Sequence, residues 1–336
     1  MRASGKLSVL FLAAFFFLAG GVLGSDLSLR VYGGLGYVDG GDLSRSISGW
    51  RSYYQDRQSS GFSSSYDLGD MHGTAEVGVE AVLALSRYWS LSLGLGYIRQ
   101  KTSGEITTRT ISHQDIATSP SGPWTVDFEQ TTEQYPVSTK WTIPIILSLD
   151  YLLELNTKWT LTLGGGGGIY PGRLEYQEIY GVESETISEQ KTGDGVVQFI
   201  DRLSTAGDYS EKTQSTGFGL HGRVGLEFEL GSSTFLSLTV LGRWVNMNGW
   251  EGTRHDASEW QRTYGLWGSQ SAEGTDERAE DGQYWTYDLQ DEKSGKSYPV
   301  LVFRETAPSP SSRPASLNLS GVSVQVGLGF RFGGKS

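Results

Sequence analysis

The chain has 336 residues, a formal net charge of −11, 46 glycines and no cysteine. The acidic balance excludes a protein that binds nucleic acid through general electrostatics, and the absence of cysteine excludes disulfide bonds. The length allows one large or two small domains.

The first 24 residues have the pattern of a secretory signal peptide. Arg2 and Lys6 precede the apolar run LSVLFLAAFFFLAGGV, and small residues at 22 and 24 predict cleavage before Ser25. An uncleaved membrane helix is the alternative, because the run is near the lower length limit for spanning. No later segment is apolar enough for a membrane helix, so residues 25–336 can cross a membrane only as a closed β-barrel.

Eight segments alternate apolar and polar residues with a period of two, which predicts strands. They cover residues 27–38, 75–85, 89–97, 140–151, 159–170, 218–230, 235–244 and 320–332. Three connections are short, and the other four are long loops at about 39–73, 101–138, 174–215 and 248–317. Short turns on the periplasmic side and long loops outside are typical of outer-membrane barrels, whereas such loops are rare in compact soluble domains.

Aromatic residues stand at both ends of the apolar face of these segments, as the aromatic girdles of a membrane barrel do. The expected periplasmic girdle is Trp89, Tyr151, Trp159, Phe228 and Phe332. The expected outer girdle is Tyr37, Tyr97, Trp141, Phe218 and Trp244.

The opposite face carries charges of both signs, which predicts a polar lumen. The inward positions hold Arg30, Glu76, Glu80, Lys140, Asp150, Arg223, Glu227, Glu229, Arg243 and Arg331. Charges in a narrow barrel must be paired or hydrated, so we expect a neutral salt-bridge network in which Glu76 or Glu80 meets Arg223 and Arg243. A structural plug is the preferred interpretation, and a gated ion or proton path is the alternative.

Five consecutive glycines, Gly164 to Gly168, do not form a phosphate-binding loop, because no Lys-Ser/Thr follows them. Gly164, Gly166 and Gly168 fall on the inward face, where they leave space for the long side chains of the neighbouring strand. Gly165 and Gly167 face outward, where only local curvature explains them.

The signal peptide, the eight amphipathic segments and the alternating connections resemble the small eight-stranded outer-membrane barrels of the OmpA/OmpX/OmpW type. The resemblance covers residues 25–336 and rests on topology, not on a specific motif. It implies an all-β fold, an antiparallel up-and-down transmembrane barrel, and a location in the outer membrane of a Gram-negative-type cell. Barrels of this type usually end on an aromatic residue, whereas here Gly333-Gly334-Lys335-Ser336 follows Phe332.

Catalysis has little support in the sequence. His72 lies two residues from Asp70 at a strand end, and His255 precedes Asp256, so a surface protease or a lipid A modifier with rim Asp and His residues is an alternative function. The acidic run EGTDERAED (273–281) lacks the spacing of a calcium loop. We therefore expect no catalytic residue, no metal and no cofactor.

The last long loop contains four tryptophans, Trp250, Trp260, Trp267 and Trp285, which we expect to pack together or to bind a partner. Within it, residues 284–303 have the pattern of a β-hairpin. The expected function is a monomeric outer-membrane barrel with a structural, adhesive or partner-binding, or narrow-pore role. Its expected partners are outer-membrane lipid and lipopolysaccharide, and the loops offer a place for an extracellular ligand. A secreted soluble β-barrel is the remaining alternative.

Overall fold

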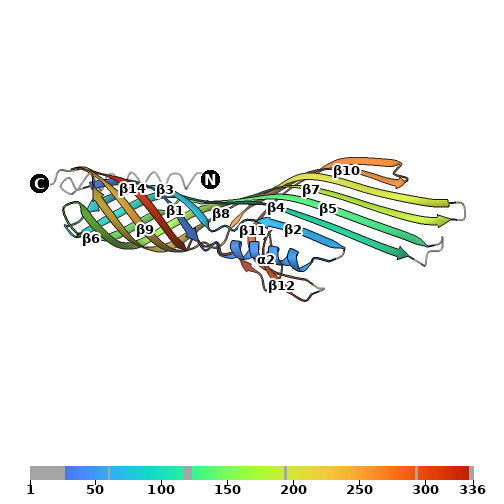
Figure 1. Cartoon of the computed structure of the whole chain (residues 1–336), viewed down its shortest axis with the longest axis horizontal. Helices are drawn as coiled ribbons and strands as arrows, with labels where there is room; N and C mark the ends of the chain where they lie inside the picture. The colour runs from blue at the N-terminus through green and yellow to red at the C-terminus, as the bar shows by residue number, and fades with distance from the viewer. Residues whose placement is uncertain (1–26, 60, 117–122, 193–194, 292–293, 333–336) are drawn as a thin grey trace.

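The computed structural model describes residues 27–59, 61–116, 123–192, 195–291 and 294–332. The signal peptide expected over residues 1–24 lies outside this part of the chain. The described residues form one antiparallel sheet of 14 strands and one α-helix. Figure 1 shows an elongated molecule with a ring of strands at one end and a longer, open sheet that carries the helix at the other.

The helix is α2 (Asp42–Asp56). The strands are β1 (Leu27–Val38), β2 (Phe62–Leu68), β3 (Gly73–Ala84), β4 (Trp89–Ile116), β5 (Trp124–Thr142), β6 (Ile145–Glu154), β7 (Trp159–Thr192), β8 (Gly195–Glu229), β9 (Thr234–Asn246), β10 (Glu251–Leu266), β11 (Gln270–Gln290), β12 (Ser297–Arg304), β13 (Arg313–Pro314) and β14 (Gly321–Phe332).

The strands at one end pair in a closed order, which we call the ring. β1 pairs with β3, β3 with β4, β4 with β6, and β6 with β7. β7 pairs with β8, β8 with β9, β9 with β14, and β14 returns to β1. The sequence-predicted segments lie in these strands, and the three short connections lie at 85–88, 155–158 and 230–233 as expected. One segment, 140–151, is interrupted at Ile143-Pro144, because proline has no N–H to donate to a sheet ladder.

The second part of the sheet is an arc in the order β2, β4, β5, β7, β8, β10, β11, β12. Its middle strands are continuations of ring strands, since β7 and β8 have 34 and 35 residues and pair along their whole length. Helix α2 packs against β2 at one edge of the arc and against β12 at the other. The helix therefore bridges the two edges of the arc.

The four ranges expected as loops are largely ordered strands, which corrects the sequence interpretation. Residues 101–116, 124–138 and 174–192 extend β4, β5 and β7, and residues 39–73 contain α2 and β2. Their alternation escaped detection because Thr, Ser, Gln and Glu replace the apolar residues on most positions, so period-2 hydrophobicity is weak there. The hairpin expected over 284–303 is confirmed, because Gln290 pairs with Ser297.

The largest buried apolar cluster lies where the ring meets the arc, and we call it the junction cluster. Its members are Ile98, Tyr170, Leu174, Val245, Met247, Trp250, Tyr284, Phe303, Ala315, Leu317 and Leu319. Segment 315–319 is held across it by backbone hydrogen bonds from Leu317 to Met247 and from Leu319 to Val245. The four tryptophans of the expected loop do not gather: Trp250 is in the cluster, while Trp267 is 62% exposed at a hairpin tip. No helix in the described ranges is long and apolar enough to cross a membrane.

Candidate functional site

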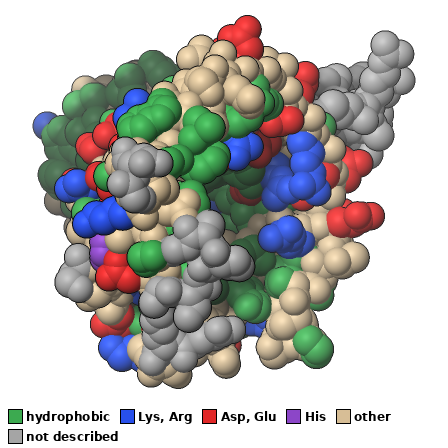
Figure 2. Space-filling model, turned by 90° about the vertical axis from the view of Figure 1, so that its right-hand side faces the viewer, with side chains coloured by type: hydrophobic (Ala, Val, Ile, Leu, Met, Phe, Trp, Pro, Cys, Tyr) green, Lys and Arg blue, Asp and Glu red, His purple; other side chains and the backbone are tan. Residues whose placement is uncertain are grey.

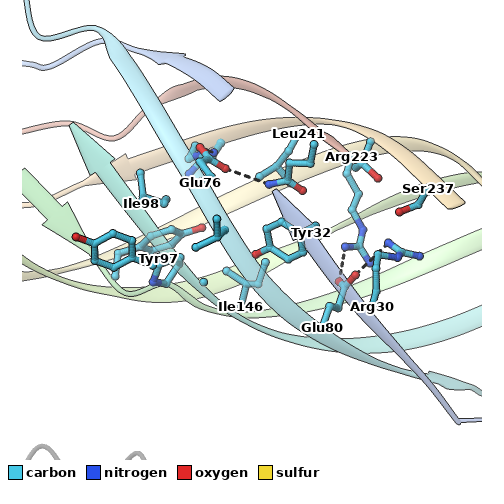
Figure 3. Close-up of a pocket in the computed structure, with 17 residues that line it drawn as sticks. Arg30, Tyr32, Glu76, Glu80, Tyr97, Ile98, Ile146, Arg223, Ser237 and Leu241 are labelled. Carbon is cyan, nitrogen blue, oxygen red and sulfur yellow. Dashed lines mark hydrogen bonds and ion pairs between the residues drawn. The ribbon is translucent and has the colours of Figure 1, made fainter. Parts of the chain in front are cut away.

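Two places in the fold concentrate charged side chains: the lumen of the ring and a cavity in the arc. In the lumen, Glu80 of β3 lies at the centre of an ion-pair network. Arg30 Nη1 donates to Glu80 Oε2 at 3.0 Å, and Arg223 donates to the other oxygen of the same carboxylate. Arg223 also holds Asp150 through its Nε at 2.8 Å. Figure 3 shows Arg30 and Arg223 converging on Glu80.

Two further groups continue the network toward the two ends of the ring. Arg243 donates to Glu76, which also accepts a hydrogen bond from Gln325 at 3.0 Å. At the opposite end, Arg331 pairs with both Glu227 and Glu229, and Arg30 reaches Glu227 as well. The described structure thus brings nine of the ten sequence-predicted lumen residues into ion pairs.

The network fills the lumen. The arginines Arg30, Arg223 and Arg243 are each at most 8% exposed, and the carboxylates that they hold are equally buried. The remaining cavity between them measures about 30 Å³, which is enough for only a water or two. Each buried charge has an opposite charge in contact, so the large cost of burying an isolated ion does not arise.

Lys140, the tenth predicted lumen residue, is placed differently. It lies in β5, which is not a ring strand, and it is next to the residues Leu174 and Trp250 of the junction cluster. Its Nζ donates to the carbonyl of Asn318 at 3.0 Å and lies 5.7 Å from the ring centre of Trp250. No carboxylate of the described residues pairs with it, and burial lowers its pKa to about 7.

The inward glycines lie where a side chain has no space. A Cβ on Gly164 would lie 1.8 Å from Oδ1 of Asp150, and one on Gly166 would lie 1.9 Å from the carbonyl oxygen of Leu147. A Cβ on the outward Gly167 would lie no closer than 3.3 Å to any neighbour. Gly164 therefore makes room for the lumen carboxylate Asp150, whereas Gly166 allows the backbone of β6 to approach closely.

The outer surface of the ring is apolar. Large hydrophobic side chains are exposed along its strands, among them Val31, Leu35, Val77, Leu147, Leu163, Leu220, Val224, Leu238, Val240, Val324 and Val326. Girdle residues meet in cross-strand pairs at the ends: Trp89 with Tyr151 at 5.3 Å and Trp159 with Phe228 at 4.7 Å between ring centroids. At the other end, Tyr97 stacks on Trp141 at 6.5 Å.

His72 and His255 do not pair with their sequence neighbours Asp70 and Asp256. His72 Nδ1 contacts the carbonyl of Val38 at 2.9 Å and its ring stacks on Tyr37, while Asp70 pairs with Arg51. His255 contacts Glu277 at 3.0 Å and not Asp256. No group of three or more metal-ligating side chains occurs in the described part of the chain.

The arc contains a larger cavity, of about 400 Å³, that sequence reasoning missed. It lies between α2 and the sheet of the arc, and residues of α2, β2, β4, β5, β7, β8, β10, β11 and β12 line it. Six tyrosines and one tryptophan form much of its wall: Trp50, Tyr54, Tyr66, Tyr176, Tyr180, Tyr209 and Tyr284. Figure 2 looks at the molecule from the end with the hairpin tips and shows hydrophobic side chains inside a hollow, with Lys and Arg side chains beside it.

Tyrosines and glutamates alternate on the floor of this cavity. In the register of β7 and β8, Tyr176 lies opposite Glu211, and Glu178 lies opposite Tyr209. The hydroxyl of Tyr176 donates to Glu178, and the hydroxyls of Tyr209 and Tyr284 donate to Glu211. Burial raises the pKa of both Glu178 and Glu211, although these hydrogen bonds act to lower it.

A sequence signal for this floor exists in the alternation itself. In EYQEIY (175–180) the even positions Tyr176, Glu178 and Tyr180 share one face of a strand, and DYSE (208–211) repeats the Tyr-x-Glu spacing. The pattern carries no information about α2, which covers these strands and lines the other side of the cavity. The cavity was therefore not predictable from these residues.

No protein-family model matches the chain, and no curated protein matches it significantly. Among solved structures, the outer membrane protein OprG from Pseudomonas aeruginosa matches 92% of this chain and 96% of its own, with 10% identity and a TM-score of 0.30. The outer membrane protease OmpT from Escherichia coli matches 92% and 97%, with 8% identity and a TM-score of 0.28. An outer membrane channel from Pseudomonas putida F1 matches 92% and 96%, with 8% identity and a TM-score of 0.21. All three are similar to this chain only at these low scores, and all three are outer-membrane proteins, the class that the strand pattern resembles.

Proposed function

We propose that the protein is an eight-stranded, up-and-down outer-membrane barrel, formed by the ring, that carries the arc outside the membrane as a binding platform. The observation that carries the proposal is the inverted polarity of the ring: its outer surface is apolar and its interior is charged. A soluble barrel of this size needs the opposite arrangement, whereas lipid requires an apolar outer belt with aromatic residues at its borders.

The proposed barrel is closed to solutes. Its lumen retains a cavity of only about 30 Å³ between paired arginines and carboxylates, and the junction cluster covers its outer end with apolar side chains. A narrow-pore role is therefore disfavoured. The function then belongs to the arc, which carries the only helix of the described residues and the cavity of about 400 Å³.

Expression with the signal sequence, followed by membrane fractionation and gels of unboiled and boiled samples, tests the barrel. We expect the protein in the outer membrane and a mobility shift on boiling, because a closed hydrogen-bonded wall resists SDS. A soluble periplasmic or secreted protein without the shift would refute the proposal.

Planar-bilayer recording tests the closed lumen on the same preparation. We expect no stepwise conductance for the unmodified protein, because ion pairs occupy the lumen at three heights. Reproducible channel openings from the purified protein would refute the closed lumen and support a narrow-pore role.

A further inference from the structure

We propose that the arc cavity binds a small organic cation, an aromatic or aliphatic amine, with its ammonium group at Glu178 and Glu211 and its apolar body among the tyrosines. The inference rests on the proposed role of the arc as a binding platform and names the class of ligand that it takes.

The arc cavity has the size and the aromatic wall of a site for a small organic molecule. The cavity of about 400 Å³ lies within the range of sites that enclose small molecules. Its wall is largely aromatic, and the Tyr176 and Tyr209 rings are 6.0 Å apart in an edge-to-face arrangement. Faces of aromatic rings attract cations, and this attraction increases where water is excluded.

The carboxylates on the floor of the cavity have few cationic partners. Glu178 accepts hydrogen bonds from Tyr176 and from Gln134 Nε2 at 2.9 Å, but no cation of the described residues pairs with it. Arg254 lies near Glu211, yet its guanidinium is engaged by Glu280 at 2.5 Å and lies over the ring of Tyr209. Arg304 lines the cavity but is exposed to solvent. The partly buried Glu178 thus has no cationic partner among the described residues, and the buried Glu211 shares Arg254 with Glu280. This balance favours a positively charged ligand over a negative one.

The cavity wall also contains a buried hydroxyl group, that of Ser138, without a hydrogen-bond partner among the described residues. Ser138 lines the cavity, is 5% exposed, and its Oγ has no hydrogen-bond partner in the described structure. It lies opposite Tyr176 in the register of β5 and β7. A buried hydroxyl without a partner is costly, and an ammonium group held at Glu178 has three N–H donors to offer in this region.

The test uses the full chain in detergent micelles and three probes with the same ring and different head groups. These are phenethylamine, 2-phenylethanol and 3-phenylpropanoate, measured by isothermal titration calorimetry at pH 7.5, where the amine is protonated. We expect phenethylamine to bind at least about tenfold more tightly than the alcohol, and the carboxylate not to bind. Equal binding of amine and alcohol, preferred binding of the carboxylate, or no binding of any probe would overturn the proposal.

Variants then locate the binding. Glu178→Gln keeps the shape and the hydrogen bond from Tyr176, so we expect it to weaken phenethylamine by about tenfold without changing the alcohol. Glu183→Gln is the matched control, because Glu183 is exposed on the opposite face of the same strand. Equal losses in both variants would contradict the assigned place. Each sample is also checked for the boiling shift on gels, so that failure of the barrel and failure of amine binding are told apart.

Discussion

Gly164 lies beside the carboxylate of Asp150, which holds the guanidinium of Arg223 in the centre of the lumen. The contact exists because glycine has no Cβ: the nearest position for one is 1.8 Å from Asp150 Oδ1. Asp150 in turn accepts from Arg223 Nε at 2.8 Å. The size of one residue on β7 therefore decides whether an ion pair between β6 and β8 keeps its geometry.

We expect Gly164→Ala to lower the free energy of unfolding by about 1–3 kcal/mol, because the new methyl group displaces Asp150 in a filled interior. Urea unfolding of the protein in phospholipid vesicles measures this change. Gly167→Ala is the matched control, since its Cβ meets no atom closer than 3.3 Å. Equal effects of the two substitutions would show that backbone flexibility, and not space for Asp150, explains the glycines.

Lys140 gives the stability of the outer part a pH dependence. Burial lowers its folded-state pKa to about 7, below the usual value near 10.4 of an exposed lysine. Between these two values the unfolded chain binds the extra proton, so stability rises with pH, by up to about 1.4 kcal/mol per unit. Below about pH 7 both states are protonated and the dependence ends.

We expect Lys140→Met to be more stable than the unmodified protein at pH 7 and to lose the rise in stability between pH 7 and 10. The apolar side chain fits the junction cluster without the cost of desolvating an ammonium group. Urea midpoints at several pH values measure both effects. If the stability of Lys140→Met still rises between pH 7 and 10, groups other than Lys140 cause the rise.

At the scale of elements, α2 is the part that turns an open arc into an enclosed cavity. Its first residue, Asp42, is 3% exposed and accepts two hydrogen bonds of 2.7 Å from Arg313. The amide of Ser316 and the hydroxyl of Thr286 donate to the same carboxylate. Although burial acts to raise its pKa, these contacts lower the pKa of Asp42. The stability that they contribute is present above the usual carboxyl pKa and is lost as the pH falls through the lowered one.

We expect Asp42→Asn to loosen α2 by about 1–3 kcal/mol, because a charged acceptor of four hydrogen bonds becomes neutral. Limited chymotrypsin digestion measures this, since the helix contains Trp50, Tyr53 and Tyr54, and cleavage there is expected to accelerate by about tenfold or more. Asp67→Asn, at an exposed position of β2, is the control. Unchanged cleavage in Asp42→Asn would show that other contacts fix the helix.

Most of the ring was predictable from the sequence, whereas in the arc only the hairpin at 284–303 was, for a physical reason. Ring strands separate an apolar side from a charged side, so Leu, Val and Ile alternate with Arg, Glu and Ser. Nine of the ten charges expected to point inward form ion pairs with one another. Arc strands have no lipid to face, so their period-2 signal is weak. Lys140 was misplaced because the break at Pro144, which ends β5 before the ring, was not anticipated. The cavity was missed because α2 precedes its partner strand β12 by more than 200 residues, beyond any local pattern.

At the scale of the whole molecule, the ring and the arc differ in what covers their outer surfaces. Leu238 on β9 and Ile179 on β7 are both exposed apolar residues, 49% and 66%, one on the ring and the other on the arc. In the proposed barrel only Leu238 faces lipid. We expect Leu238→Arg to make folding into vesicles less favourable by about 2–4 kcal/mol.

The control is Ile179→Arg, for which we expect a change within about 0.5 kcal/mol, as for most surface substitutions. Folding yields in phospholipid vesicles, read as the fraction of protein that shifts on boiling, measure both variants. If arginine is tolerated equally at the two positions, the outer surface of the ring does not contact lipid.

The two enclosures of the molecule also determine when it can finish folding. The ring closes only when β14 pairs with β1, and the arc closes only when α2 meets β12 and Arg313, through contacts such as Ser46 with Leu301. Both closures join the beginning of the chain to its end, and folds dominated by such distant contacts form slowly. During synthesis and export the strand edges of both parts therefore stay open together, and open edges are the sites at which chains aggregate. We therefore expect the chain to be prone to aggregation until its last strand has paired.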